Sequence, residues 1–323
     1  MSRVHTYIAR SASEMDRVAS LWNHLLDLQT HSIFQRFTWN RLAAEMFSDR
    51  LTPHVVCAES DRGAAIIPAV INHRDDRIEL IGETLFDYRD FLHAGEQRPL
   101  LHAWHQLAAL DKPLQVTAID QSTAQHRWNQ FPTTVFASAP QVDHNNLDSL
   151  AFRLSHPRLG RQMRRLQKRG VEHRRYSGND SAAVGSLYGR KGSNFTVNTS
   201  FNIFADDRRR EFMVEAARLE ADDCRIYTLE QAENLVAGIV TFRDGETRRF
   251  YTTYFSPEWA HYSPGQALLY EATARTLEED LSSDYMTGEY PYKLRLANSS
   301  RPLFCANVSS RELADVATHA TAA

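Results

Sequence analysis

The sequence has few cysteines and no long apolar run, and both absences limit the kind of protein that it encodes. Its three cysteines, Cys57, Cys224 and Cys305, are odd in number and widely spaced along 323 residues. This spacing argues against a disulfide framework or a zinc cluster and favours buried thiols in a reducing compartment. The longest apolar run, 64–71, is too short to cross a bilayer, and residues 1–20 lack the apolar core of a secretory signal. We therefore expect a cytoplasmic protein that does not insert into a membrane.

The sequence also lacks a charge excess of one sign and several catalytic motifs. The formal net charge is −3, which gives no general attraction to nucleic acid or membranes. There is no His-Glu-x-x-His, P-loop, Gly-x-Gly-x-x-Gly or Gly-x-Ser-x-Gly sequence, and the 14 histidines show no paired ligand spacing. A serine hydrolase therefore has no support, and we expect no metal.

The order of predicted elements indicates an α+β protein with two domains, because a chain of this length is too long for one small core. The second half reads helix, helix, antiparallel meander, glycine turn, helix and strand, and a looser version runs from Phe34 to Ile119. We interpret this as one plan used twice, each time a mixed, mostly antiparallel sheet flanked by helices. The predicted boundaries are 1–145 for the first domain, 146–310 for the second and 311–323 for a flexible tail.

Apolar spacing and turn residues define the individual elements. Helices are predicted over 13–28, 40–47, 99–110, 158–170, 208–220 and 266–279. Strands are predicted over 54–59, 64–72, 77–81, 115–119, 133–137, 224–230, 235–243, 248–255 and 284–287.

The stretch from Tyr251 to Lys293 carries the strongest functional signal. A strand leads to Tyr262-Ser263-Pro264-Gly265, and a helix begins directly after it. The first backbone N–H groups of a helix have no intrahelical acceptor, and the helix dipole adds positive charge at that end. The amides of Gly265, Gln266 and Ala267 are therefore candidates for holding a donor phosphate, although a simple proline-initiated helix start gives the same pattern.

This stretch resembles the bacterial CelD-like acetyltransferases of the GNAT superfamily, which are close to the Fem-type aminoacyl transferases. The resemblance rests on Tyr262-Ser263-Pro264-Gly265 with its apolar helix and on Asp284-Tyr285-Met286-Thr287-Gly288-Glu289-Tyr290-Pro291-Tyr292-Lys293. It covers about 147–303 well and the first half loosely. Two further segments agree with it, the Arg-rich stretch 158–170 and Phe34-Gln35-x-x-x-Trp39 with Asp87-Tyr88-x-Asp90.

The resemblance implies two GNAT-like domains and transfer of an acyl group to an amine or hydroxyl. A lysine after an aromatic residue has a role in Fem-type enzymes at the matching strand, and we carry that role to Lys293. Its ammonium could steady a donor phosphate or the oxyanion formed during attack. Tyr292 could protonate the leaving group, and Glu289 could remove the proton of the attacking group. A solvated lysine, a packed tyrosine and an exposed turn carboxylate are the alternatives for these three residues.

One departure from the GNAT pattern bears on the donor. Acetyl-CoA enzymes carry two glycines in this turn, whereas this sequence has Gly265 alone, after Pro264. Because proline has no N–H, one possible pyrophosphate donor is missing. Acyl-CoA, aminoacyl-tRNA and acyl-carrier donors therefore all remain open, and so does a non-catalytic binding module in polysaccharide or envelope biosynthesis.

Two further features concern the acceptor and nucleic acid. Asp87, Tyr88 and Asp90 could bind the amine or hydroxyls of a small-molecule, saccharide or peptide acceptor, or could form an ordinary Asx-type turn with a half-buried tyrosine. The Arg-rich stretch 158–170 could contact tRNA phosphates. A solvated basic helix face is the more common explanation for such a stretch.

Overall fold

The chain forms two compact units in a computed structural model that describes residues 3–82, 84–193 and 203–318. Unit 1 is Met1–Ala137 with Pro302–Ala323, and unit 2 is Ser138–Arg301. The chain therefore enters unit 2 at residue 138, earlier than the predicted 146. Residues 302–310, predicted to belong to the second domain, return to unit 1. The predicted tail begins with a helix, α12 (Ser310–Thr318), in which Leu313 is buried in the unit 1 core.

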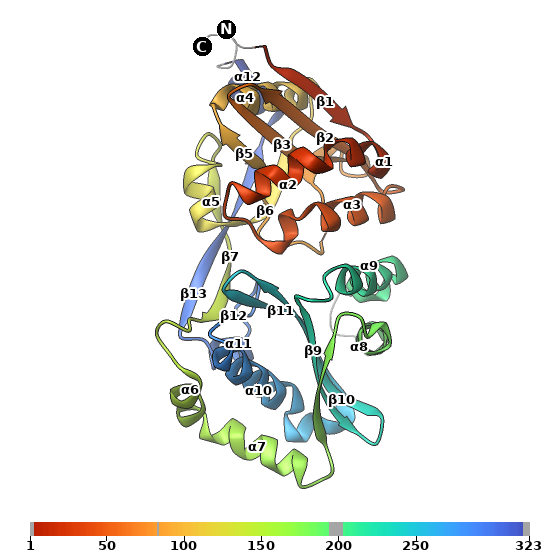
Figure 1. Cartoon of the computed structure of the whole chain (residues 1–323), viewed down its shortest axis with the longest axis vertical. Helices are drawn as coiled ribbons and strands as arrows, with labels where there is room; N and C mark the ends of the chain where they lie inside the picture. The colour runs from red at the N-terminus through yellow and green to blue at the C-terminus, as the bar shows by residue number, and fades with distance from the viewer. Residues whose placement is uncertain (1–2, 83, 194–202, 319–323) are drawn as a thin grey trace. The chain divides into compact units, whose positions relative to one another are not determined.

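Unit 1 is built on a mixed sheet with the order β1-β2-β3-β4-β6-β13, and β5 pairs with the first residues of β3, Gly63 to Ile66 (Figure 1). β2 and β3 form a hairpin in which Ser60 faces Gly63 across a two-residue turn. The pair β4–β6 is parallel, and the other pairs are antiparallel. The strands are β1 (His5–Ala9), β2 (Leu51–Ser60), β3 (Gly63–Asn72), β4 (Arg77–Leu80), β5 (Leu92–Gly95), β6 (Leu114–Asp120) and β13 (Ser299–Val308).

Helices cover both faces of the unit 1 sheet. Alternate residues of a strand point to opposite faces, and Ala65, Ile67 and Ala69 of β3 pack in one core with Trp104 of α4. α2 and α3 contact β3 and β2. The helical segments are α1 (Ala12–Met15), η1 (Asp16–Val18), α2 (Ala19–Asp27), η2 (Ile33–Gln35), α3 (Phe37–Met46), α4 (Gln97–Ala108), α5 (Gln121–His126) and α12.

Unit 2 repeats the plan of unit 1 with the strand order β8-β9-β10-β11-β12-β7. Its one parallel pair is β11–β12, next to which β7 runs antiparallel to β12. In both units a helix lies on the connection between the parallel partners, α4 in unit 1 and α10 (Pro264–Glu278) in unit 2. The strands are β7 (Thr133–Val142), β8 (Glu172–Ser177), β9 (Cys224–Gln231), β10 (Asn234–Asp244), β11 (Thr247–Phe255) and β12 (Ser282–Asp284).

The helices of unit 2 also lie on both sides of its sheet (Figure 1). The core that joins α6, α7 and α10 to β9 and β10 includes Phe152, Met163, Leu268, Tyr227 and Ile239. α8 and α9 pack on each other, and α8 contacts β10 and β11. The helical segments are α6 (Ser149–Ser155), α7 (Pro157–Gln167), α8 (Ser181–Ser193), η3 (Ile203–Ala205), α9 (Asp207–Leu219), η4 (Pro257–Tyr262), α10 (Pro264–Glu278) and α11 (Pro291–Leu294).

The predicted fold class is confirmed, since each unit is a mixed, mostly antiparallel sheet flanked by helices. The strand predicted over 284–287 is an exception, because β12 ends at Asp284. Met286, two residues later, has a left-handed backbone with φ of 62°. An extended strand cannot continue through that conformation. The prediction that Lys293 stands at a strand end is therefore wrong, and Lys293 lies in the short helix α11.

Candidate functional site in unit 2

The site forms where the parallel strands β11 and β12 separate. Their pairing is limited to three positions, from Thr247 opposite Ser282 to Arg249 opposite Asp284. Beyond this point the chain after β12 turns to β7, where the amide of Tyr285 donates to the carbonyl of Pro140 at 3.0 Å. β11 stays with β10, and Tyr251 is the extra residue of a bulge in that pairing. We call the region between residues 250–255 and 285–288 the strand splay.

Buried charges hold the closed end of the splay together. Arg249 donates through Nε to Asp244 at 2.6 Å and through a terminal nitrogen to Asp284 at 2.7 Å. Gln141 of β7 also donates to Asp284, at 3.2 Å, and the amide of Met286 donates to its other oxygen at 2.8 Å. Asp284 thus links β7, β11 and the turn after β12. Its contacts explain why this residue is buried without assigning it a role in chemistry.

The helix start predicted to bind an anion is present. α10 begins at Pro264, and Ser263 before it has a left-handed backbone with φ of 50°. The amide of Ala267 donates to the carbonyl of Ser263 at 3.1 Å. Ala267 therefore makes the first helical bond, and its amide is not available to a ligand. Among the described residues, the amides of Gly265 and Gln266 have no acceptor, so two of the three predicted donors remain.

The surroundings of this helix start add a cation that the sequence did not single out. Arg295, just after α11, donates to the side-chain oxygen of Gln266 at 3.5 Å. The exposed ring of Phe255, at the end of β11, lies beside Gly265, where a Cβ atom would stand 3.3 Å from the ring. The start of α10 therefore combines unsatisfied amides, an exposed aromatic ring and a nearby guanidinium.

Lys293 reaches the splay from α11. Its side chain is buried, and its ammonium donates to the carbonyls of Thr287 at 2.8 Å and Met286 at 3.2 Å. The ring of Tyr290 lies 5.2 Å from the ammonium. The alternative of a solvated lysine is therefore excluded by its burial, and the ammonium lies beside the residues that follow β12.

Tyr292 and Glu289 occupy different environments. Burial raises the pKa of Tyr292, although a hydrogen bond with Thr253 of β11 opposes the change. Tyr292 therefore keeps its proton at neutral pH and remains able to donate it. Glu289 lies in the turn between β12 and α11, and its side chain is exposed.

Lys191, at the end of α8, is a residue of this site that sequence reasoning missed. Its ammonium donates to the carbonyl of Thr253 at 2.8 Å and lies 5.5 Å from the ring of Phe204. Burial and the charge of Lys293 lower the pKa of Lys191 to about 8. Two ammonium groups thus lie within electrostatic reach of each other. Lys191 bonds the β11 side of the splay at Thr253, and Lys293 bonds the side that follows β12.

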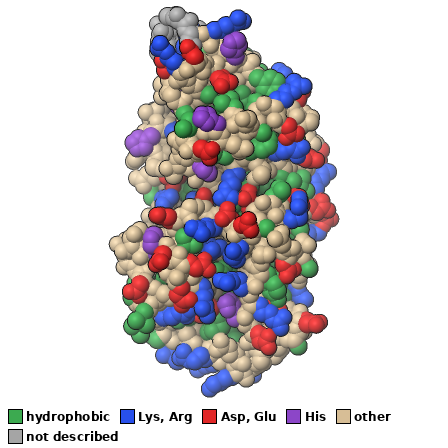
Figure 2. Space-filling model, viewed as in Figure 1, with side chains coloured by type: hydrophobic (Ala, Val, Ile, Leu, Met, Phe, Trp, Pro, Cys, Tyr) green, Lys and Arg blue, Asp and Glu red, His purple; other side chains and the backbone are tan. Residues whose placement is uncertain are grey.

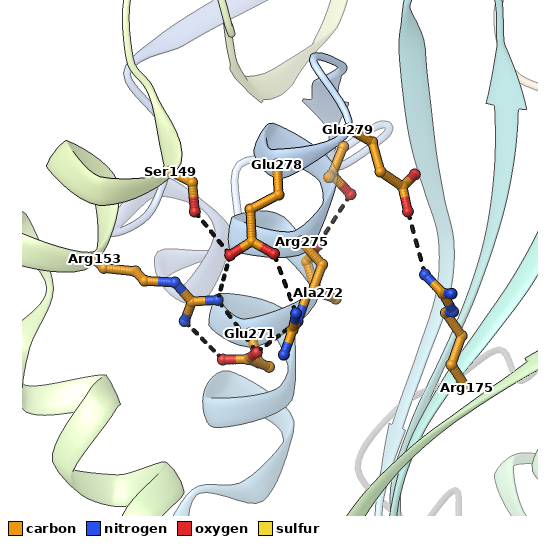
Figure 3. A network of polar contacts seen from close by, with 9 residues as sticks. Ser149, Arg153, Arg175, Glu271, Ala272, Arg275, Glu278 and Glu279 are labelled. Carbon is orange, nitrogen blue, oxygen red and sulfur yellow. Dashed lines mark hydrogen bonds and ion pairs between the residues drawn. The ribbon is translucent and has the colours of Figure 1, made fainter.

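An ion-pair network fixes α6 against α10, the helix that starts at the site. Figure 3 shows Arg153 of α6 between Glu271 and Glu278 of α10, with Ser149 and Arg275 beside them. Arg153 contacts Glu271 at 2.8 Å and Glu278 at 3.1 Å. Arg275 contacts the same two carboxylates, at 3.0 and 3.2 Å. Burial alone would raise the pKa of Glu271, but the hydrogen bond and charge of Arg153 outweigh it, and the pKa is lowered.

This lowered pKa predicts a pH-dependent stability. Because the folded pKa of Glu271 lies below its unfolded value, its contribution is complete above the unfolded pKa and is lost as the pH falls through the folded one. We expect E271Q to lower the free energy of unfolding by about 2 kcal/mol at pH 7. The difference in free energy of unfolding between E271Q and the parent protein should shrink below about pH 4. Urea unfolding at pH 7 and pH 3.5 measures this, and an equal loss at both values would contradict it.

The predicted acceptor residues lie in unit 1. Tyr88 is buried, has φ of 52°, and stacks on Phe34 with 6.3 Å between ring centroids. Asp90 is buried and accepts hydrogen bonds from Arg127, from Trp128 at 3.1 Å and from the amide of Phe91 at 2.8 Å. Burial raises the pKa of Asp90 to about 6 against the opposing charge of Arg127. These contacts account for Tyr88 and Asp90 without a ligand. Asp87 is half-buried, and acceptor binding by this group stays a prediction.

The Arg-rich segment is the amphipathic helix α7, which ends close to the predicted glycine cap. Leu159, Met163 and Leu166 face the core, and Gly170 has φ of 77°. In Figure 2 blue side chains gather at the bottom of the view, where α7 lies in Figure 1. Exposed cations without an ion pair to any described residue are Arg158, Arg161, Arg164, Arg165, Lys168 and Arg169. α7 also packs along α10, and Arg169 lies 4.6 Å from the ring of Tyr262, just before the helix start.

Two absences among the described residues concern metal ligands and membrane-spanning helices. No group of three His, Cys, Asp or Glu side chains there could hold a metal ion. Within residues 3–82, 84–193 and 203–318, none of the helices has the length and apolar character needed to cross a bilayer.

Comparison with known proteins identifies the fold. Residues 156–294 match the family model described as acetyltransferase (GNAT) domain. No curated protein sequence matches the chain. Similar solved structures include FemX, with a TM-score of 0.58 and 10% identity over 97% of this chain and 100% of that one. L-PGS from Bacillus licheniformis has a TM-score of 0.54 and 10% identity over 94% of this chain and 96% of that one. A tandem GNAT protein from the clavulanic acid biosynthesis pathway has a TM-score of 0.53 and 11% identity over 94% of this chain and 98% of that one.

The chain is thus an α+β protein in which residues 156–294, within the second unit, match a GNAT acetyltransferase domain. The predicted resemblance to the GNAT superfamily and to Fem-type proteins is confirmed at the level of the fold. At identities of 10–11%, these structural neighbours establish the fold alone.

Proposed function

We propose that this protein transfers an acyl group from an acyl-CoA, or a similar thioester, to an amine or hydroxyl acceptor by direct attack. The observation that carries the proposal is the strand splay, with the start of α10 and the two lysines beside it. The gap in backbone pairing between β11 and the chain after β12 offers an extended donor arm a place to lie. The amides of Gly265 and Gln266, with Arg295 nearby, would hold the donor phosphates.

The chemistry then depends mainly on positioning, because a thioester is already reactive. A base removes a proton from the acceptor, and the acceptor attacks the acyl carbon. The ammonium of Lys293 stabilises the oxyanion, and the hydroxyl of Tyr292 protonates the departing thiolate. Glu289 is the base suggested by the sequence, and its exposed position leaves it in reach of a soluble acceptor.

Donor binding is tested at the start of α10 with a matched pair of variants. Because G265D brings a carboxylate next to the amides that would hold phosphate, we expect it to weaken acetyl-CoA binding by about tenfold to a hundredfold. G265A adds a methyl group that meets only the exposed ring of Phe255. It should weaken binding by at most about threefold. Isothermal calorimetry measures both, and unchanged binding in G265D would show that the donor site is misassigned.

The exposed cations of α7 favour one second candidate, a Fem-type transfer from aminoacyl-tRNA. Four cations on α7, which packs along α10, and two more directly after it could contact phosphates close to the donor site. Binding of charged and uncharged tRNA at 50 and 200 mM salt separates the candidates, because phosphate contacts weaken steeply with salt. Absence of salt-sensitive tRNA binding would exclude this candidate. Mass spectrometry of co-purifying ligands would further identify the donor by a pantetheine mass.

A further inference from the structure

Lysine is rare in this protein, and its distribution is uneven. The sequence has only four lysines among 37 Lys and Arg residues: Lys112, Lys168, Lys191 and Lys293. Lys168 is exposed directly after α7, and Lys112 forms an ion pair with Asp76 in unit 1. The other two bond backbone carbonyls on the two sides of the splay. Most of the positive charge of this protein comes from arginine, yet two of its four lysines lie at the strand splay.

Lysine differs from arginine in a property that matters at such a site. A guanidinium stays charged at any physiological pH, whereas a lysine that is partly buried or near another cation loses its proton more readily. Lys191 meets both conditions, since it is partly buried and within electrostatic reach of Lys293. No carboxylate among the described residues forms an ion pair with it.

Within the part of the chain that the structure describes, few groups lie near the ammonium of Lys191. α11 contributes the ammonium of Lys293 and the hydroxyl of Tyr292, which bonds Thr253 of β11. η3 contributes the ring of Phe204. From α9, Arg210 donates to the carbonyl of Phe204 at 2.9 Å and pairs with Asp207. Among the described residues, the charge that acts on Lys191 is therefore that of Lys293, and it favours the neutral amine.

We propose that Lys191 is the general base of the reaction, an inference that rests on the proposed acyl transfer. The neutral amine of Lys191 takes one proton from the ammonium of the acceptor. The freed nitrogen attacks the acyl carbon, the C–N bond forms, and the C–S bond breaks. The second proton of that nitrogen passes to the thiolate through Tyr292, which gives an amide and a free thiol. Lys191 then returns its proton to solvent, so that the enzyme is regenerated. The acceptor class is a primary amine.

Competitive labelling of the intact protein with acetic anhydride measures the protonation of each lysine directly. Peptides are mapped by mass spectrometry after labelling at pH values from 6 to 10. We expect labelling of Lys191 to rise at a lower pH than that of Lys168, which is exposed on the same unit. Coincident profiles for the two lysines would overturn the inference, and this measurement needs no knowledge of the donor.

Substitutions test the step itself. K191R keeps the charge but cannot act as a base, so we expect K191R and K191Q to reduce thiol release from acetyl-CoA by about 10²–10⁴-fold. Acetyl-CoA binding by calorimetry should stay within about twofold of the parent protein, because Lys191 is not placed at the phosphates. K112Q, in unit 1, serves as the control and should leave thiol release unchanged. Activity retained in K191R, or a larger loss in E289Q than in K191R, would refute the assignment.

The two proposals fail in different ways. If the parent protein binds no acetyl-CoA or related thioester, the proposed function is wrong, and the proposed proton transfer to Lys191 is then wrong as well. If the parent binds and cleaves the donor while Lys191 titrates like Lys168, acyl transfer stands and the role of Lys191 is wrong.

Discussion

Replacing Asp284 by alanine is expected to destabilise unit 2 by about 3–5 kcal/mol, the usual cost of removing one partner of a buried ion pair. The carboxylate is 1% exposed, and the guanidinium of Arg249 that it pairs with is 9% exposed. Without Asp284, that guanidinium keeps Asp244 but loses a charged partner in the interior. The amide of Met286 and the amide group of Gln141 lose an acceptor at the same time. Urea unfolding, followed by circular dichroism, measures the change.

An exposed ion pair of the same unit provides the control. Glu215 and Arg218 of α9 pair on the surface, with side chains 37% and 56% exposed. Removing such a pair costs about 0–1 kcal/mol, because solvent already screens the charges. E215A should therefore unfold close to the parent protein. Similar losses in D284A and E215A would mean that Asp284 does not organise the closed end of the splay.

Sequence spacing predicts helices and strands, but it does not predict which charged residues, such as Asp284, are buried. The start of α10 was predicted correctly, because a helix that begins at a proline leaves a recognisable local pattern. The predicted helices over 158–170, 208–220 and 266–279 correspond to α7, α9 and α10 for the same reason. However, the charges at 284 and 289 differ in burial, and no local pattern separates an ion-paired aspartate from an exposed turn glutamate.

Long-range pairing accounts for the elements that the sequence did not predict. β13 contains Pro302 and several polar residues, so its sequence does not resemble a strand, yet it pairs with β6 from Leu303 opposite Asp120 to Val308 opposite Leu114. Its pairing partner, almost 200 residues away, decides its conformation. For the same reason, the C-terminal residues join unit 1, contrary to a boundary drawn from sequence order. Lys191 was missed in a similar way, because only packing of α8 on the sheet brings it to Thr253.

Replacing Lys293 by methionine is the change with the largest expected effect on the proposed reaction. Methionine keeps the apolar length of the side chain, but it cannot donate to the carbonyls of Met286 and Thr287 or carry charge. Removing one donor that stabilises a developing oxyanion costs about 10²–10³ in turnover, and we expect thiol release from acetyl-CoA to fall by this factor in K293M. Donor binding should change by less than about tenfold, since the interaction develops mainly in the transition state.

Two comparisons separate this catalytic effect from a structural one. K293R retains a positive charge and donors for the two carbonyls, so it should recover part of the lost turnover if charge at the oxyanion is what matters. K112M removes a lysine of unit 1 that pairs with Asp76, and it should leave turnover unchanged. Thermal unfolding of all three variants shows whether unit 2 is intact. Turnover in folded K293M within about threefold of the parent protein would remove Lys293 from the chemistry, since a buried ammonium that stabilised the oxyanion could not be replaced by a thioether without a large loss of rate.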